Sequence, residues 1–173
     1  MLKGRHVNLR IMEREDLSIV KNWDNEIGIM GEYEPIVQET KADLERQFDK
    51  LTDGQWFFIE KKDGTKIGFI THFIAHGTVI GYALLPNERG KGYGSETIQI
   101  VVDYLFLSKN IVRIQAETHP ENIASHRALE KSGFKKEGVI RQSFFSRGFW
   151  RDTAMFSVLR DDWKEPRILT RKT

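Results

Sequence analysis

The spacing of apolar and polar positions along the chain predicts a series of strands and helices. Residues 7–12 (VNLRIM) alternate apolar and polar side chains, which is typical of a half-buried strand. Residues 93–109 repeat apolar side chains every three or four positions, which is typical of a helix packed on a core. By the same criteria we expect strands at 7–12, on both sides of the Asp63-Gly64 turn within 55–75, and at 78–86, 111–119, 134–145 and 151–163, and helices at 13–23, 39–51, 93–109 and 122–133.

The order of these elements, β-α-α-β-β-β-α-β-α-β-β, predicts the fold class. We expect an α/β (α+β) protein with a mixed, strongly twisted sheet of about seven strands and helices on both faces. Asp16, Thr40 and Asn122 are candidate N-caps of three helices, and Gly133 is a candidate C-terminal stop. A turn at residues 146–148 would join the last two strands. Residues 26–37 form an irregular segment, which is either a lid or substrate wall or a plain connector.

Composition narrows the class of protein. The 173 residues suit one domain, expected at 1–163, followed by a basic tail at 164–173 that we expect to be a solvated end. A formal net charge of +2 gives no support to nucleic-acid binding. The chain has no 18-residue apolar run and no signal-peptide pattern, so we expect no membrane span and a cytoplasmic location. The absence of cysteine excludes disulfides and thiolate catalysis.

The sequence RGKGYG at residues 89–94 is the strongest candidate for a ligand site. It lies between a predicted strand and a predicted helix, where main-chain N–H groups are unpaired and the helix dipole favours negative charge. Glycines let the backbone approach a phosphate closely, and Arg89 and Lys91 add positive charge. The glycine spacing fits neither a Walker loop nor a dinucleotide fingerprint. We therefore expect a pyrophosphate cradle of another kind.

Two motifs resemble those of the GCN5-related N-acetyltransferases. Arg89, Gly92 and Gly94 fill the Arg/Gln-x-x-Gly-x-Gly/Ala signature of that family. The segment NIASHRALEKSGF at 122–134 is similar to the family's second block. The opening residues 2–17 and the closing residues 150–163 are similar to the branch that acetylates ribosomal-protein N-termini. The resemblance covers residues 3–163.

The resemblance implies acetyl-CoA as co-substrate, bound where the strand before the glycine loop splays from the next parallel strand. Main-chain groups of Ala83, Leu84 and Leu85 would pair with the pantetheine amides, and one N–H would stabilise the oxyanion. Asn122 would bind the pantetheine arm, and Arg127 the 3′-phosphate or only solvent. The residues expected at the pyrophosphate are Arg89, Gly90, Lys91, Gly92, Tyr93, Gly94 and Ser95. No metal site is expected.

The acid and the base of the reaction are less defined by the sequence. Many family members protonate the departing thiolate with a Tyr, but the matching position here is Leu129. Ser125 is the nearest substitute, although a Ser in a first helical turn commonly bonds the backbone. The Glu that the branch often carries corresponds to Val79. The remaining candidate bases are Glu117, Glu34, His72, His76 or a water molecule.

Three functions remain open at this point. The first is acetylation of a protein or peptide N-terminal amine, possibly of a ribosomal protein. The second is acetylation of a small amine such as a polyamine or aminoglycoside, for which the four glutamates between Glu26 and Glu39 could supply an acidic cleft. The third is a non-catalytic CoA-binding module, a hypothesis that Val79 and Leu129 keep open. The candidate acceptor-binding residues are Glu34, His72 and Tyr82.

The aromatic residues near the last turn are a further sequence feature. Phe144, Phe145, Phe149 and Trp150 cluster there, and such a cluster is more often core or dimer contact than a base-stacking platform. A homodimer with this cluster at its contact is therefore one expectation from the sequence.

Overall fold

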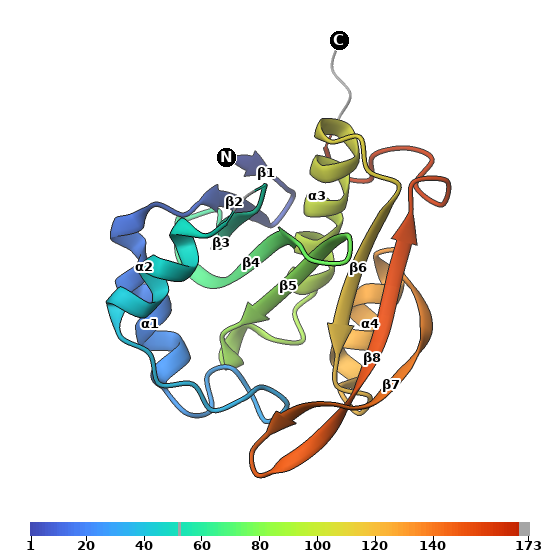
Figure 1. The fold of residues 1–173 in the computed structure, drawn as a ribbon. Coiled ribbons are helices and arrows are strands. Elements are labelled where there is room, and N and C mark those ends of the chain that lie inside the picture. The colour runs from blue at the N-terminus through green and yellow to red at the C-terminus, as the bar shows by residue number, and fades with distance from the viewer. Residues whose placement is uncertain (52, 170–173) are drawn as a thin grey trace.

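In the computed structural model, which describes residues 1–51 and 53–169, one twisted sheet of eight strands runs through the molecule (Figure 1). The strands lie in the order β1-β2-β3-β4-β5-β6-β8-β7, and the pairing of β5 with β6 is parallel while the others are antiparallel. The predicted fold class is confirmed, and the strand beyond the expected seven is the short β1. The strand bounds are β1 (Leu2–Lys3), β2 (Val7–Ile11), β3 (Gln55–Lys61), β4 (Lys66–Ile74), β5 (Thr78–Leu84), β6 (Arg113–Thr118), β7 (Lys135–Ser146) and β8 (Phe149–Leu159).

Helices cover both faces of the sheet, as the sequence predicts. Neighbouring residues of a strand point to opposite faces, and β3 shows the division: Phe57 and Ile59 lie in the core under α3, whereas Phe58 packs with α1 and α2. In Figure 1, α1 and α2 lie at the β2–β4 end of the sheet, and α4 lies behind β6 and β8. The helix bounds are α1 (Leu17–Asn25), α2 (Lys41–Asp49), α3 (Tyr93–Ser108) and α4 (Ile123–Lys131).

Two of the three predicted N-caps are confirmed. The hydroxyl of Thr40 accepts a hydrogen bond from the N–H of Asp43, and the side chain of Asn122 accepts one from Ser125. The prediction for Asp16 is wrong, because a 3-10 turn at Arg14–Asp16 precedes α1 and leaves Asp16 in a helical conformation. Its carboxylate instead accepts hydrogen bonds from Arg10 at 2.9 and 3.0 Å.

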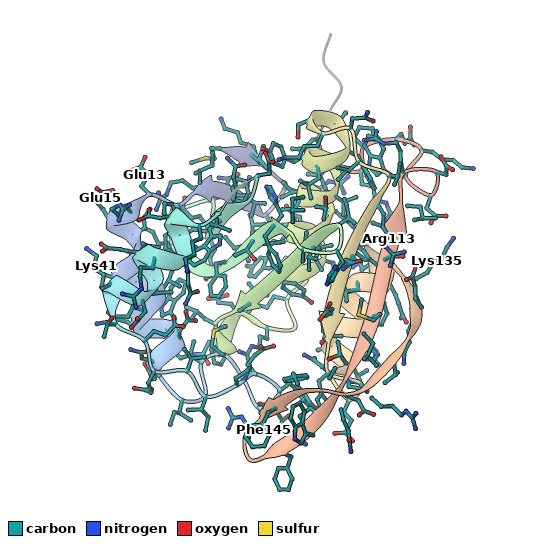
Figure 2. The ribbon with its side chains drawn as sticks, viewed as in Figure 1. Glu13, Glu15, Lys41, Arg113, Lys135 and Phe145 are labelled. Carbon is teal, nitrogen blue, oxygen red and sulfur yellow. The ribbon has the colours of Figure 1, made fainter. Side chains whose placement is uncertain are left out.

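The last two strands form a long hairpin that projects from the sheet. Its turn holds Arg147 and Gly148 at φ values of 51° and 82°, which is the positive-φ pair that a tight two-residue hairpin turn requires. Phe145 lies at the end of this hairpin, away from the core (Figure 2), and Phe149 and Trp150 are also largely exposed. This aromatic cluster is therefore not core, and a role in self-association stays a prediction.

The C-terminal segment is docked on the domain rather than solvated. Asp103 of α3 is fully buried, and its carboxylate accepts hydrogen bonds from the indole of Trp163 and from the N–H groups of Arg167, Ile168 and Leu169. The expected boundary at residue 163 is thus too early, since the docked chain extends at least to residue 169. The rest of the expected tail, 170–173, lies outside the described residues.

Candidate active site

The strands β5 and β6 separate at the place where the sequence analysis expects a cleft. They pair over only three positions, Thr78–Ile80 with Ile114–Ala116, and then diverge (Figure 1). On the other side, β5 stays paired with β4 along its whole length, from Thr78 to Leu84. The C-terminal half of β5 therefore presents one unpaired main-chain edge toward β6.

The register of β4 and β5 shows which main-chain groups line this open edge. The N–H of Leu85 donates to the carbonyl of Ile67 at 2.9 Å, so this opposed pair is hydrogen-bonded. Hydrogen-bonded and non-bonded pairs alternate along an antiparallel ladder. Ala83 therefore also faces β4, whereas Tyr82 and Leu84 turn their N–H and C=O groups to the open side. The expectation that Ala83 and Leu85 offer main-chain groups to a pantetheine arm is wrong for this reason. Of the three expected residues only Leu84 faces the open side, together with Tyr82.

The glycine loop opens α3 next to this edge. Gly90 and Gly92 have φ values of 73° and 86°, and a Cβ at either position would find no atom within 4 Å. Gly92 precedes the first helical residue, so the N–H groups of the first turn point outward without intrahelical partners. Gly94 serves close packing instead, because its Cβ position lies 3.4 Å from the ring of Tyr82. The loop has the open, amide-lined shape that a phosphate needs.

The charged side chains of the loop are engaged with protein groups. Lys91 pairs with Glu88 at 3.0 Å. The guanidinium of Arg89 donates to the carbonyl of Leu84 at 2.9 Å and also to the carbonyl of Ile29. Arg89, which the sequence places at the pyrophosphate, thus lies between the glycine loop and the irregular segment 26–37. Main-chain amides, more than charged side chains, are therefore the groups that this loop leaves available to an anion.

The start of α4 borders the opening on its other side. Asn122 is held there by its cap to the N–H of Ser125 at 3.1 Å. The hydroxyl of Tyr82 donates to Oγ of Ser125 at 3.2 Å, and burial raises the pKa of Tyr82 above its ordinary value. Arg127 is exposed, and Leu129 is fully buried in the core. No feature of the sequence indicates the contact between Tyr82 and Ser125, which joins two elements that are distant in the chain.

Segment 26–37, here called the wall, is tied by side-chain contacts to the glycine loop, to the end of β6 and to the β7–β8 hairpin. The ring of Tyr33 stacks on His119 at 4.8 Å, just after β6. Arg147, at the tip of the β7–β8 hairpin, donates to the carbonyls of Gly31 and Glu34, both at 3.1 Å. Together with the Arg89 contact, this stacking and these hydrogen bonds attach the segment to three parts of the fold around the opening. Its path below β5 toward the hairpin tip is visible in Figure 1.

The candidate bases fall into two groups. Glu117 is exposed on β6 beyond the paired region. Glu34, on the wall, is also exposed as a residue, while partial desolvation of its carboxyl group raises its pKa. His72 is 1% exposed under α3, and burial lowers its pKa to about 4. His76 lies in the turn between β4 and β5, at the opposite end of β5 from the glycine loop. Glu34 and Glu117 therefore stay candidate bases on elements that border the opening, whereas the predictions of His72 and His76 as site residues are wrong.

Comparison with known proteins assigns the family. Residues 6–135 match the model of the acetyltransferase (GNAT) domain. The probable N-acetyltransferase YjcK of Bacillus subtilis is 30% identical over 94% of this chain and 98% of its own length. The chain therefore belongs to the GNAT family, is an enzyme of the N-acetyltransferase type and uses acetyl-CoA.

Relatives of stated substrate fall into two kinds. The spermidine N(1)-acetyltransferase of Vibrio cholerae is 26% identical over 91% of this chain and 95% of its own length. A crystal structure of spermidine N-acetyltransferase from that organism with CoA and spermine matches with a TM-score of 0.81 at 25% identity, covering 92% of this chain and 99% of its own. The ribosomal-protein-S5-alanine acetyltransferase of Vibrio fischeri matches with a TM-score of 0.80 at 25% identity, covering 94% and 98%.

The described residues give two further findings on the general character of the protein. No group of three or more His, Asp or Glu side chains in residues 1–51 and 53–169 is arranged to hold a metal ion. Within the same ranges, no helix combines the length and the apolar character needed to cross a membrane.

Proposed function

We propose that this enzyme transfers the acetyl group of acetyl-CoA to a primary amine of a small polyamine of the spermidine type. Similarity to the Vibrio cholerae spermidine enzyme in both sequence and structure supports this substrate class. A small polyamine therefore replaces the protein N-terminal amine, which is the first hypothesis from the sequence, as the preferred acceptor.

The observation that carries the proposal is the acidic character of the wall over the site. Segment 26–37 contains three glutamates and neither Lys nor Arg. The two guanidinium groups that reach it, from Arg89 and Arg147, donate to its main-chain carbonyls, and within residues 1–51 and 53–169 neither forms an ion pair with its carboxylates. An acidic wall attracts a polycation and disfavours a neutral or anionic acceptor.

The coenzyme is held in this proposal by main-chain groups along the β5 edge and at the start of α3. The N–H and C=O groups of Tyr82 and the N–H group of Leu84 pair with the pantetheine amides, since the C=O of Leu84 already accepts from Arg89. One of these N–H groups polarises the thioester carbonyl. The N–H groups of Tyr93, Gly94 and Ser95 bind the pyrophosphate. The other residues that the sequence predicts at the coenzyme make contacts beside these groups. They are Gly90, Lys91, Gly92, Asn122 and Arg127.

The acceptor amine must lose a proton before or during its attack on the thioester. An alkyl ammonium group has a pKa of about 10.4, so at neutral pH it needs a base or a water relay. Glu117 takes this proton, directly or through water, from the open edge of β6. Glu34, on the wall opposite, binds a second ammonium group of the polyamine.

A thiol-release assay with acetyl-CoA and a panel of amines tests the proposal. We expect turnover with spermidine and spermine and none with peptides that begin with Ser or Ala. Turnover with the peptides alone would favour the protein N-terminal amine, the second candidate, which the similarity to the S5-alanine enzyme supports. Tight CoA binding without turnover on any amine would identify a non-catalytic module.

A further inference from the structure

Tyr82 and Ser125 form a bridge across the opening between β5 and α4. The phenol hydroxyl of Tyr82 donates to Oγ of Ser125 at 3.2 Å, although the two residues are 43 positions apart. The ring of Tyr82 lies beside Gly94 at the start of α3, where a Cβ would stand 3.4 Å from the ring, an ordinary contact distance. The bridge thus joins β5 to α4 beside the start of α3, next to the open edge of β5.

This hydrogen bond determines where the proton of Ser125 points. A hydroxyl group has one hydrogen and two lone pairs. Because Oγ of Ser125 accepts from Tyr82, its own hydrogen is directed away from Tyr82 and can be donated to another group. The N–H of Ser125 is held by Asn122, so the first turn of α4 keeps this hydroxyl in place.

The reaction needs a proton at this point of the site. When the carbon–sulfur bond breaks, the departing thiolate takes up a proton, and a thiol has a pKa of about 8.5. Leu129, at the position where the family often carries a Tyr, is fully buried and has no proton to give. A serine can hand its proton to the thiolate only if another group refills it at once, because an isolated alkoxide is strongly disfavoured.

We propose that Tyr82 supplies, through Ser125, the proton that the departing CoA thiolate takes up. This inference rests on the proposed function. The amine nitrogen forms a bond to the thioester carbon and gives up one proton to a base or water. The carbon–sulfur bond then breaks, its electron pair stays on sulfur, and the sulfur takes the proton of Ser125. Ser125 takes the proton of Tyr82, and solvent returns one proton to the phenolate.

The burial of Tyr82 fits this role. Burial raises the pKa of its phenol above the ordinary value, against a smaller opposing effect of the hydrogen bond to Ser125. Tyr82 therefore keeps its proton at neutral and mildly alkaline pH, so both hydroxyl groups of the bridge carry a proton before each turnover. Tyr82 acts through Ser125, so it is a positioning and proton-supplying residue, while Ser125 is the one that meets the sulfur.

The test compares Tyr82→Phe, Ser125→Ala and the double variant with the wild-type enzyme. Tyr104→Phe is the matched control, because Tyr104 also donates its hydroxyl to a side chain, that of Gln55, but in the second half of α3. We expect kcat to fall about a hundredfold or more in Tyr82→Phe and in Ser125→Ala, the range of a lost general acid. The double variant should be no slower than the slower single variant, and Tyr104→Phe should match the wild type. CoA affinity and the amine KM should change less than about twofold.

A second acetyl donor distinguishes a loss of proton supply from a change in the shape of the site. The acetyl thioester of an acidic aromatic thiol releases a thiolate that needs no proton, so the deficit of Tyr82→Phe should shrink to nearly nothing with this donor. An equal deficit with both donors, or additive losses in the double variant, would overturn the proposal. If the wild type acetylates peptides instead of spermidine, the acceptor assignment fails alone and the same comparison runs with peptides. A wild type inactive on every amine overturns both proposals.

Discussion

At the scale of single residues, the glycine loop gives the sharpest contrast between structural and ligand-binding roles. Gly92 and Gly64 have nearly the same φ, 86° and 84°, and at neither would a Cβ meet any atom within 4 Å. Gly92 opens α3, whereas Gly64 lies in the turn between β3 and β4. The two positions therefore share one backbone conformation and differ in what we propose occupies the space beside them.

We expect Gly92→Ala to weaken CoA binding about tenfold or more and Gly64→Ala to leave it unchanged. Both variants force a non-glycine residue into the left-handed region, which costs about 1 kcal/mol of stability in each. Only the Cβ at Gly92 enters the proposed phosphate space. Calorimetric titration with CoA and urea denaturation measure the two effects, and equal CoA affinity in the two variants would remove Gly92 from the cradle.

His72 gives a prediction about stability in acid. Both of its ring nitrogens are buried without a hydrogen-bond partner in the described structure, and burial, reinforced by Lys109, lowers its pKa to about 4. The unfolded chain binds this proton near pH 6.5, so the free energy of unfolding should fall as the pH drops from about 6.5 to about 4, by up to about 3 kcal/mol. Below that pH range the contribution of His72 to the free energy of unfolding no longer changes with pH.

The variant His72→Leu should lack this part of the pH dependence. His76→Ala is the control, because His76 is exposed and its removal should leave the profile as in the wild type. Urea denaturation at several pH values measures the difference. Profiles of His72→Leu and wild type that run parallel between pH 6.5 and 4 would contradict the assignment.

The spacing of residue types along the chain predicts roles that depend on the conformation of a few consecutive residues. It does not predict roles that depend on packing between distant elements. Gly92 and Asn122 were found from the sequence because a left-handed turn and a helix cap each involve a few consecutive residues. The bond from Tyr82 to Ser125 and the burial of His72 depend on how distant elements meet. A histidine on an alternating strand gives the same pattern whether its face is covered by α3 or open to solvent.

At the scale of elements, periodicity predicts the helices and strands, with small errors at their ends. The 16 residues of α3 fall within the predicted range because their apolar pattern is long. The error at Asp16 arose because a 3-10 turn and an α-helix begin with the same residue types. The docking of the C-terminal segment was missed because its acceptor, Asp103, lies more than 60 residues earlier.

We expect Asp103→Asn to destabilise the protein by about 3 kcal/mol. One carboxylate oxygen would become an NH₂ group that faces N–H donors, which leaves buried donors without an acceptor. Asp162→Asn is the control, since Asp162 makes a surface ion pair with Lys135, and exposed ion pairs contribute little to stability. Urea denaturation measures both, and trypsin should cleave at Arg167 faster in Asp103→Asn. Similar stability of the two variants would show that Asp103 does not hold the segment.

At the scale of the whole molecule, the site exists because one segment joins three distant parts of the fold. Segment 26–37 contacts the glycine loop through Arg89, the end of β6 through Tyr33, and the β7–β8 hairpin through Arg147. The first two of these contacts border the proposed coenzyme site, and the third fixes the wall on the acceptor side. In the proposed function, the hairpin therefore shapes the acceptor site from a distance.

We expect Arg147→Ala to raise the KM for the acceptor amine about threefold to tenfold while CoA affinity stays unchanged. The variant loses two hydrogen bonds from a charged donor, each exposed or only partly buried, so the wall is held less firmly. Arg151→Ala, which removes only the guanidinium over the ring of Phe149 in the same hairpin, should behave as the wild type. An unchanged amine KM in Arg147→Ala would contradict a role of the wall in acceptor binding.

The proposed function depends most on the open edge of β5 as the place where the acyl-CoA arm binds. Amide hydrogen exchange, followed residue by residue by NMR with and without saturating CoA, tests this directly. We predict that CoA slows exchange at Tyr82 and Leu84, whose N–H groups face the opening, and leaves Ala83 and Leu85 unchanged because β4 already protects them. Saturated CoA binding with no change at Tyr82 and Leu84 would contradict the account.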